Sequence, residues 1–581
     1  MTRTASAILA IVALGGGCAD GPQSPRVDLV LVGGHVIDVE SGETLRDRDV
    51  WIAEGRIVSI APSGARAIPS GTMTVDAHDH FLAPGLVGAH VHLDHIDELE
   101  LYTAKGVTTV FNMRGLPQHL NWRDAIARGE RDGPTIYTAG DYMDGYPPFM
   151  QPMMSFDNPE EAAASVRAQR DAGYDMIKVY TRLSLEQLKA IATAAREVGL
   201  PVVGHGSANY SLAELVDSGQ VNAAHGQDLL RWYIEDAEDE AGVGEIVETL
   251  RGTAMTVTAN LSFTAGLIRQ AEDLDGLLAE PIARSLPAAI LQPFRRANNR
   301  YVRRGIDWLP EVKARFEMEK RLARELHGAG VTLLAGTDAS TAGVLPGTAL
   351  HHEIELLVEA GLSPVDALRA ATLAPGRFVA EHIDADARFG QVVEGYRADI
   401  LVVRGNPLED VARLADAAGV VVRGRWLDRE TLDARLAALA EKSRAVTPGV
   451  IEIENAIKSG DLAAAREPFD AVRAETPNEI LFSQYVPFFI GYGYLYGDDG
   501  FNPDPARRAA ALTLYQMYAE TYPAFHSAHY MLALAHEAND DATAAIASLK
   551  DALAIHPYYP DARQKLAELA AAEAAEDGHS D

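Results

Sequence analysis

Short apolar runs alternate with amphipathic stretches along residues 80–385 of this 581-residue chain. The amphipathic stretches 159–172, 184–198 and 211–218 are expected to be helices, since serines precede the last two and glycines follow them. Apolar runs between such helices are typical of buried parallel strands. We expect eight strands, at 86–92, 107–113, 134–139, 176–180, 201–205, 221–225, 254–260 and 331–338.

Eight strand–helix units in about 300 residues predict a closed (β/α)8 TIM barrel, an α/β fold with its active site at the carboxyl ends of the strands. We expect this barrel over residues 80–385. Residues 261–330, between the last two strands, are too long for a simple connection, so additional helices are expected there.

A different pattern flanks the barrel on both sides. Residues 27–79 and 386–430 contain short β-like runs separated by glycine turns. Because the two segments share this pattern, we expect them to form one β-sandwich domain that is split around the barrel.

From about residue 448 the chain becomes rich in alanine and helical in pattern. The segment 528–557 resembles one tetratricopeptide repeat (TPR). We therefore expect an all-α, TPR-like domain over 448–575, which would bind a protein partner, self-associate or pack on the barrel. The packing positions of the repeat are occupied by Leu532, Ala535, Ala545, Ala552 and Pro557.

The acidic balance of the chain excludes one class of partner. With 51 basic and 83 acidic side chains, the net charge is −32 at pH 7. This charge repels phosphate backbones and anionic lipid surfaces, so we expect no nucleic acid partner. The single cysteine, Cys18, permits no internal disulfide and no cysteine-based zinc or iron–sulfur site.

Residues 1–18 have the pattern of an export signal, with an apolar run from Ala5 to Leu14 and three glycines before Cys18. This ending resembles the lipobox of bacterial lipoproteins, in which the cysteine is lipidated; cleavage by an ordinary signal peptidase near Ala19 is the alternative. We expect a lipoprotein of the bacterial periplasm that touches the membrane only through a lipid on Cys18.

Side chains of metal-binding or reactive type occur within the predicted strands or at their carboxyl ends. His90 and His92 are two apart on one strand and so point to the same face. In a chain with 18 histidines, one such pair alone would be weak evidence for a metal site. The strand positions, however, direct six residues to one mouth of the barrel: His90, His92, Lys178, His205, His225 and Asp338.

Neutral imidazoles and carboxylates are the usual ligands of zinc and similar divalent ions. A buried lysine beside cations has a lowered pKa, and its neutral amine can react with CO₂ to give a carbamate that bridges two metals. We expect two divalent ions, Zn²⁺ by preference, with a hydroxide between them. Asp338 would act as general base and then as general acid. The expected ligand sets are His90, His92 and Asp338 for one ion, and His205 and His225 for the other, with carboxylated Lys178 between.

Several strand-end motifs resemble those of the amidohydrolase superfamily, in its binuclear branch with a carboxylated lysine. They are PGLVGAHVH, IKVY, VVGHG, AAHG, AGTDAS and the closing GYRADILVV. The resemblance covers about residues 27–430, and is greatest to imidazolonepropionase-like and Xaa-Pro or Xaa-Arg dipeptidase-like enzymes. It implies a hydrolase of an amide or peptide C–N bond whose substrate is a dipeptide or an N-acyl amino acid.

Other functions stay open at this stage. A cyclic-amide hydrolase of the imidazolonepropionase type fits the motifs, although an export signal is unusual for such an enzyme. A deaminase is a further alternative, but it usually needs one metal and no bridging lysine. A different class would be a non-catalytic envelope lipoprotein that binds a partner through its helical domain.

The residues outside the metal set have several expected roles. Four residues at strand ends are candidates for substrate contact: Tyr180, Asn112, Arg114 and Asn260. His80 is expected to be structural, and His351 and His352 to be exposed. The arginine-rich stretch 295–304 has two interpretations, a solvated helix face or a lid that binds a substrate carboxylate.

Overall fold

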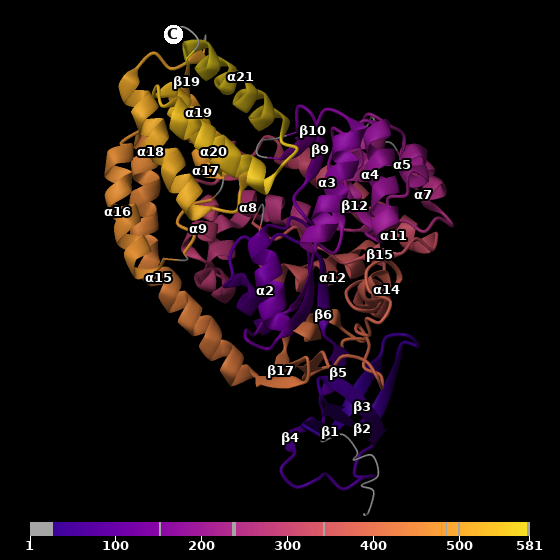
Figure 1. The fold of residues 1–581 in the computed structure, drawn as a ribbon. Coiled ribbons are helices and arrows are strands. Elements are labelled where there is room, and N and C mark those ends of the chain that lie inside the picture. Colours follow the sequence, from indigo (N-terminus) through magenta and orange to yellow (C-terminus); the bar gives the residue numbers. More distant parts are fainter. Residues whose placement is uncertain are drawn as a thin grey trace, which may run out of the picture.

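The computed structural model describes residues 27–577 except 150–152, 235–239, 341–342, 478, 484 and 498–499. The expected export signal with Cys18 lies outside the described residues. Within them, no helix is both long enough and apolar enough to cross a membrane. Figure 1 shows a β-sheet at one end, an α/β core, and a layer of C-terminal helices that runs along one side of this core.

An eight-stranded sheet joins the two segments that flank the core. Its order is β18-β17-β16-β5-β1-β2-β3, with β4 paired to β1. β16 runs antiparallel to β5, with Ile400 opposite Pro84, and the apolar side chains of both segments share one buried cluster. The strands are β1 (Leu29–Asp38), β2 (Glu43–Ala53), β3 (Arg56–Pro62), β4 (Met73–Asp76), β5 (Phe81–Pro84), β16 (Ile400–Val403), β17 (Ala417–Val422) and β18 (Arg425–Asp428).

Two parallel sheets form the α/β core, one of order β6-β7-β8 and one of order β10-β9-β11-β12-β13-β14-β15. Each of the eight expected segments contains a strand. The two three-residue strands β9 and β10 were not expected. The strands are β6 (Leu86–Val91), β7 (Val107–Asn112), β8 (Thr135–Thr138), β9 (Met143–Gly145), β10 (Met154–Phe156), β11 (Ile177–Val179), β12 (Val202–Gly204), β13 (Asn222–Ala223), β14 (Thr256–Thr258) and β15 (Leu333–Leu334).

Parallel bridges connect these two sheets. Ala139, next to β8, pairs with Met176, next to β11, and Val91 of β6 pairs with Ala339 in the segment after β15. Two further backbone bonds attach this segment to β6, because the amides of Thr337 and Asp338 both donate to the carbonyl of His90 at 3.0 Å. The ends of β15 and β6 are therefore held side by side.

The three helices that the sequence predicts between the strands begin and end within one residue of the predicted positions. Ser184 and Ser211 each accept a hydrogen bond at 3.2 Å from a backbone amide of the first turn. Gly199 and Gly219, which follow the carboxyl ends of the same two helices, have the left-handed conformation, with φ of 72° and 97°. The helices are α1 (Glu98–Ala104), α2 (Pro117–Ala127), α3 (Pro159–Ala172), α4 (Leu185–Val198), α5 (Leu212–Ser218), α6 (Gly226–Tyr233), α7 (Glu240–Leu250), α12 (Thr348–Ala360), α13 (Pro364–Ala370), α14 (Leu373–His382) and the 3₁₀ turn η3 (Val411–Ala415).

The long insertion contains additional helices, as expected. Its arginine-rich stretch lies largely on the surface: Arg296 pairs with Asp275 at 3.1 Å, and the guanidinium of Arg304 lies 5.7 Å from the Trp308 ring. These contacts favour the solvated-face interpretation over the lid. The elements are α8 (Leu261–Ala279), η1 (Pro281–Ser285), α9 (Ala288–Leu291), η2 (Gln292–Phe294), α10 (Arg300–Arg303) and α11 (Leu309–Gly328).

The C-terminal region is helical, and one long helix connects it to the sheet. α15 (Arg429–Ser459) has 31 residues, contains Pro448, and extends diagonally across Figure 1. Three alanines expected at repeat packing positions, Ala535, Ala545 and Ala552, are buried between α19 and α20. The other elements are α16 (Leu462–Glu475), α17 (Tyr485–Leu495), β19 (Tyr496–Gly497), β20 (Gly500–Phe501), α18 (Pro505–Thr521), α19 (His526–Ala538), α20 (Ala542–Ile555) and α21 (Pro560–Asp577).

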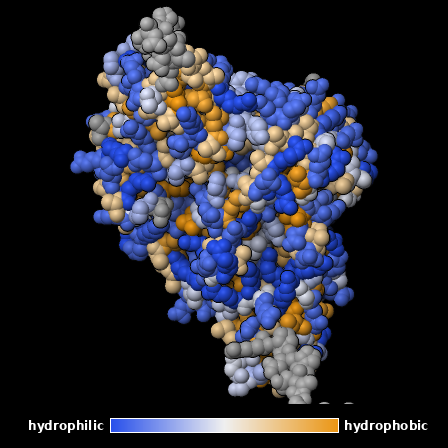
Figure 2. Space-filling view, in the orientation of Figure 1, coloured by the Kyte–Doolittle hydropathy of each residue, from blue (hydrophilic) through white to orange (hydrophobic). Residues whose placement is uncertain are grey.

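Buried ionic contacts attach this helical region to the core. Lys442 of α15 lies 2.6 Å from Asp97 and 2.8 Å from Glu479, and Glu479 also contacts His95 at 3.2 Å. Burial alone would raise the pKa of Glu479, but hydrogen bonds from His95 and Lys442 lower it to about 2. This network lies three residues after His92, so the helices are fastened close to the expected metal site. The surface that faces the viewer in Figure 2 is mainly hydrophilic.

Replacing Lys442 with methionine is expected to lower the apparent Tm by roughly 2–5 °C, because two partly or fully buried carboxylates lose their cation. Differential scanning fluorimetry at pH 7 would measure this change. The matched control is Arg444→Met, since the Arg444 side chain is 75% exposed and pairs with Glu441 at the surface. Equal Tm values for the two variants would contradict a stabilising role of the network.

Candidate active site

His90 and His92 lie at the carboxyl end of β6 and point toward Asp338, which follows β15. Their Nε2 atoms are 3.4 and 2.8 Å from Asp338 Oδ1. The backbone bonds between β6 and the segment after β15 fix this arrangement, and Asp338 has a positive φ of 59°. Two strands far apart in sequence therefore bring these three side chains together.

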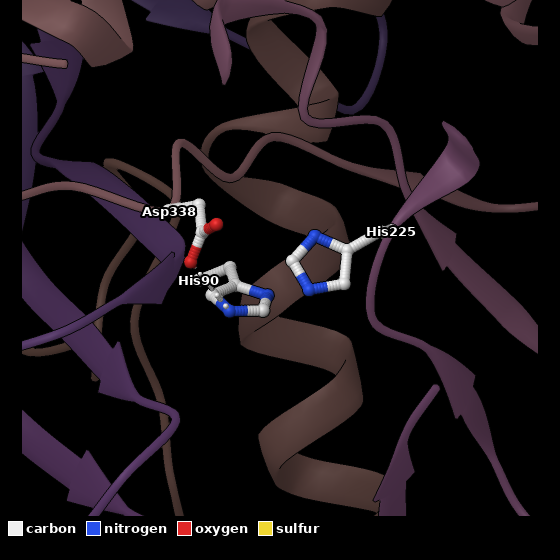
Figure 3. A group of neighbouring side chains, drawn as sticks. All are labelled: His90, His225 and Asp338. Atoms are coloured by element: carbon white, nitrogen blue, oxygen red, sulfur yellow. Dashed lines mark ion pairs between the residues drawn. The ribbon is translucent and has the colours of Figure 1, made fainter. Parts of the chain in front are cut away.

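His205 and His225 extend the group of imidazoles. They follow β12 and β13, and their ring centres are 4.6 Å apart. The His225 ring is 4.4 Å from that of His90, which is 5.3 Å from that of His92. Figure 3 shows the Asp338 carboxylate beside the His90 ring, with the His225 ring on the other side of His90. The four imidazoles and the carboxylate thus form one cluster.

Lys178, in the middle of β11, belongs to the same cluster. Its side chain is fully buried, and its Nζ forms no hydrogen bond among the described residues. Burial lowers the pKa of Lys178 to about 8, although Asp338 and Asp228 oppose this effect. The positive charge of Lys178 in turn contributes to the lowered pKa values of His90 and His205. An amine in this place is unusually easy to deprotonate.

His90, His205 and His225 are neutral at physiological pH. Burial lowers the pKa of His90 to about 3 and holds the pKa values of His205 and His225 well below their usual range. Burial alone would raise the pKa of Asp338, but hydrogen bonds from His90 and His92 keep it well below normal. Neutral nitrogens around an ionised carboxylate are the donor set that divalent metals prefer.

Sequence reasoning missed Asp228. It lies on α6, three residues after His225, and its Oδ2 is 2.5 Å from His205 Nδ1. Within the cluster, two groups have ligand atoms within 4.8 Å of one another, namely His90, His225 and Asp338, and His205, His225 and Asp228. His225 is shared between them, so the residues suit two neighbouring cations. The available signal was the spacing in HGQD, which places Asp228 one turn after a strand-end histidine.

A sequence model of the amidohydrolase family matches residues 105–427, more than half of the 581-residue chain. The chain belongs to the amidohydrolase family. The matched segment ends just before α15, so the C-terminal helices lie beyond the part that the family model describes.

Known proteins that are similar to the chain include one curated relative and two solved structures. Adenine deaminase 2 of Bradyrhizobium sp. (strain ORS 278) is 38% identical over 99 residues, which are 16% of this chain and 16% of the relative. The match therefore spans about a sixth of the relative's length. The putative prolidase from Bifidobacterium longum is 25% identical, with a TM-score of 0.55 over 71% of this chain and 100% of that one. A Xaa-Pro dipeptidase with bound methionine, 21% identical, shares the fold with a TM-score of 0.53 over 69% of this chain and 99% of that one.

Two of the four residues expected to contact the substrate, Tyr180 and Asn260, lie directly at the cluster of imidazoles and Asp338. The Tyr180 ring is 4.1 Å from the His205 ring. The side-chain amide nitrogen of Asn260 lies 2.7 Å from His225 Nδ1 and 3.3 Å from the Ala224 carbonyl, so Asn260 orients this imidazole. Tyr180 is the better placed of the two to touch a substrate.

The other two candidates are buried behind the cluster. Asn112 donates to the Arg114 carbonyl at 2.7 Å and accepts from the Leu93 amide at 3.1 Å, which fixes the loop after His92. Arg114 pairs with Asp141 at 3.2 Å, and its guanidinium lies 4.8 Å from the Phe525 ring of the helical region. Both positions organise the loops around the cluster.

The remaining histidines have different environments. His80 Nδ1 donates a hydrogen bond to the neighbouring His78 carbonyl at 2.8 Å, which is consistent with the expected structural role. The expectation that His351 is exposed is wrong, because it is buried and its Nε2 lies 2.7 Å from the Lys105 carbonyl. His352 is only partly exposed. The start of α12 faces the core, which the local sequence did not indicate.

Proposed function

We propose that this chain is an exported, metal-dependent hydrolase that cleaves an amide or peptide C–N bond in a dipeptide or an N-acyl amino acid. The observation that carries the proposal is the convergence of four imidazoles and Asp338 around the buried amine of Lys178. We also infer a closed (β/α)8 barrel, in which the bridges from β8 to β11 and from β15 to β6 complete the ring.

The residues present fit two divalent ions, with zinc as our first choice. His90, His92 and Asp338 would hold one ion and His205 and His225 the other, with Asp228 beside the second group. When bound, the ions would supply Lewis acidity and a lowered pKa for a water molecule.

Lys178 is proposed to carry a carbamate. Its neutral Nζ would form an N–C bond to CO₂ and release one proton to solvent, which leaves an anionic group with two oxygens. The negative charge of this carbamate would offset the positive charge of the two cations. The unmodified Nζ, in contrast, is buried without a hydrogen-bond partner in the described residues.

Asp338 is positioned to move the proton in hydrolysis. Its carboxylate would accept a proton from the attacking water and then donate it to the leaving nitrogen. Hydrogen bonds from His90 and His92 hold this carboxylate in its ionised form before the reaction. Asn260 would keep the His225 ring in its orientation throughout.

Adenine deamination is the second candidate, and the similarity of a 99-residue segment to an adenine deaminase favours it. A screen of the purified full-length chain would separate the two. Dipeptides, N-acyl amino acids, cyclic amides and adenine would be assayed with metal analysis, after chelation and after return of zinc. We expect two metal equivalents per chain and amide hydrolysis that chelation abolishes. Turnover of adenine alone would favour deamination, and activity that survives complete metal removal would contradict the proposal.

The proposal extends to location and partners. We propose that Cys18 anchors the enzyme to a bacterial membrane from the periplasmic side, and that residues 448–575 bind a protein or another copy of the chain. Cell fractionation of the wild type and of Cys18→Ala would test the anchor, since loss of the lipid should move the protein from the membrane to the soluble periplasmic fraction.

A further inference from the structure

Helix α6 extends from the metal cluster toward solvent and carries a second charged residue beyond Asp228. The helix begins directly after His225, and Asp228 on it contacts His205. Arg231 lies one turn further, about 4.5 Å of axial rise, on the same face. Asp228 is buried, whereas Arg231 is exposed. The helix therefore presents a cation on the solvent side of the cluster.

Aromatic rings position the guanidinium of Arg231. Its Cζ lies 4.6 Å from the centre of the Trp232 ring and 5.7 Å from that of the Phe149 ring. Phe149 is 5.7 Å from Tyr180, whose ring contacts His205. A continuous line of rings thus connects the guanidinium to the cluster, and it leaves the hydrogen-bonding edge of the guanidinium available.

Within the described part of the chain the guanidinium of Arg231 contacts rings and forms no ion pair within 4 Å. Burial raises the pKa of Asp228, and the positive charge of Arg231 opposes this rise, so the guanidinium acts on the cluster through its charge. Other exposed arginines of this acidic protein are paired, such as Arg167 with Glu197 at 2.9 Å and Arg251 with Glu248 at 2.8 Å. A guanidinium beside the active site that forms no close ion pair within the described residues is suited to an anionic ligand.

We propose that Arg231 binds the free carboxylate of the substrate, and that the enzyme requires this carboxylate one residue beyond the scissile bond. This inference rests on the proposed amide hydrolysis. In a dipeptide or an N-acyl amino acid, one residue separates the scissile carbonyl from the terminal carboxylate, and consecutive Cα atoms are about 3.8 Å apart. The rings of Phe149 and Tyr180 connect Arg231 to His205, and its charge acts on Asp228, so a substrate whose carbonyl lies at the cluster can direct its carboxylate toward the guanidinium.

The test uses the metal-loaded full-length chain and matched probes, N-acetyl-L-amino acids and the corresponding carboxamides. For each hydrolysed probe kcat and KM are measured, and for each probe that is not hydrolysed the Kd is measured by calorimetry. Arg231→Met is compared with Arg231→Lys, which keeps the charge but loses the planar fork. Arg304→Met is the matched control, since Arg304 is also exposed and lies 5.7 Å from a tryptophan ring.

We expect the parent enzyme to prefer carboxylates over carboxamides. Arg231→Met should raise KM or Kd for carboxylates about 10- to 100-fold, with little change in kcat or in carboxamide binding. Arg231→Lys should give KM or Kd values for carboxylates between those of the parent and of Arg231→Met. Arg304→Met should give the values of the parent. The assignment is overturned if the parent treats both probe classes alike, if neither class binds, or if Arg231→Met weakens both equally. Selective carboxylate binding without hydrolysis would contradict the proposed reaction but support the role of Arg231.

Discussion

Asp338→Asn is expected to reduce kcat about 10²- to 10⁴-fold, the range of general acid–base catalysis. Asparagine has nearly the same shape as aspartate and keeps one oxygen for a metal, but it cannot take up the proton of the attacking water. The carboxylate is ionised in the parent, because hydrogen bonds from His90 and His92 outweigh the effect of burial on its pKa. Steady-state kinetics on the substrate found in the screen would measure the loss, and elemental analysis would show that metal is retained.

The control for this variant is Asp366→Asn. Asp366 pairs with Arg369 at 2.7 Å on α13 and lies outside the cluster, so its loss should leave kcat unchanged. Substantial turnover in Asp338→Asn with full metal content would remove Asp338 from the proton path. Loss of metal together with activity would instead indicate that Asp338 acts mainly as a ligand.

Lys178→Ala is expected to cause the second large effect, a fall in kcat/KM of about 10³-fold together with loss of metal. The substitution removes the proposed bridging group and leaves a cavity between the two ligand sets. Short carboxylates such as acetate fit this cavity and carry the same two oxygens, so they should restore part of the metal binding and activity. Metal content and kcat/KM, each with and without acetate, would measure this outcome.

Lys178→Arg is the matched control, because arginine keeps a positive charge but its guanidinium does not form the carbamate. It should be as inactive as the alanine variant, and acetate should not rescue it. Enzyme prepared in ¹³C-labelled bicarbonate should show a carbamate carbon signal that Lys178→Arg lacks. A fully active Lys178→Arg enzyme, or a parent without this signal, would refute the modification.

The parts of the fold that the sequence predicted well are those with a strong local period. The core strands alternate with amphipathic helices, and both Ser184 and Ser211 cap helices where expected. The cluster was predictable for the same reason, since His90, His205 and Asp338 each lie at or just beyond the end of a strand. Parallel strands bring such positions to one edge without knowledge of the packing.

Other residues of the site escaped sequence reasoning because tertiary contacts decide their roles. Asp228 and Arg231 lie on a short helix, and only the position of α6 beside His205 distinguishes them from ordinary surface charges. His351 was expected to be exposed because it begins a helix after the Asp338 loop, yet its Nε2 lies 2.7 Å from the Lys105 carbonyl on the buried side of α12. The contact of Glu479 with His95 joins regions that no local pattern relates.

The split sheet has a consequence for the way the chain is made. β5 pairs with β1 on one side and β16 on the other, and Arg56 donates to the Gly395 carbonyl across 339 residues at 3.0 Å. A nascent or truncated chain that stops before β16 therefore keeps an open strand edge, which invites aggregation and attack by proteases. Only a chain that includes β16 covers the free edge of β5. Cellular proteases can therefore distinguish incomplete chains from complete ones by this exposed edge.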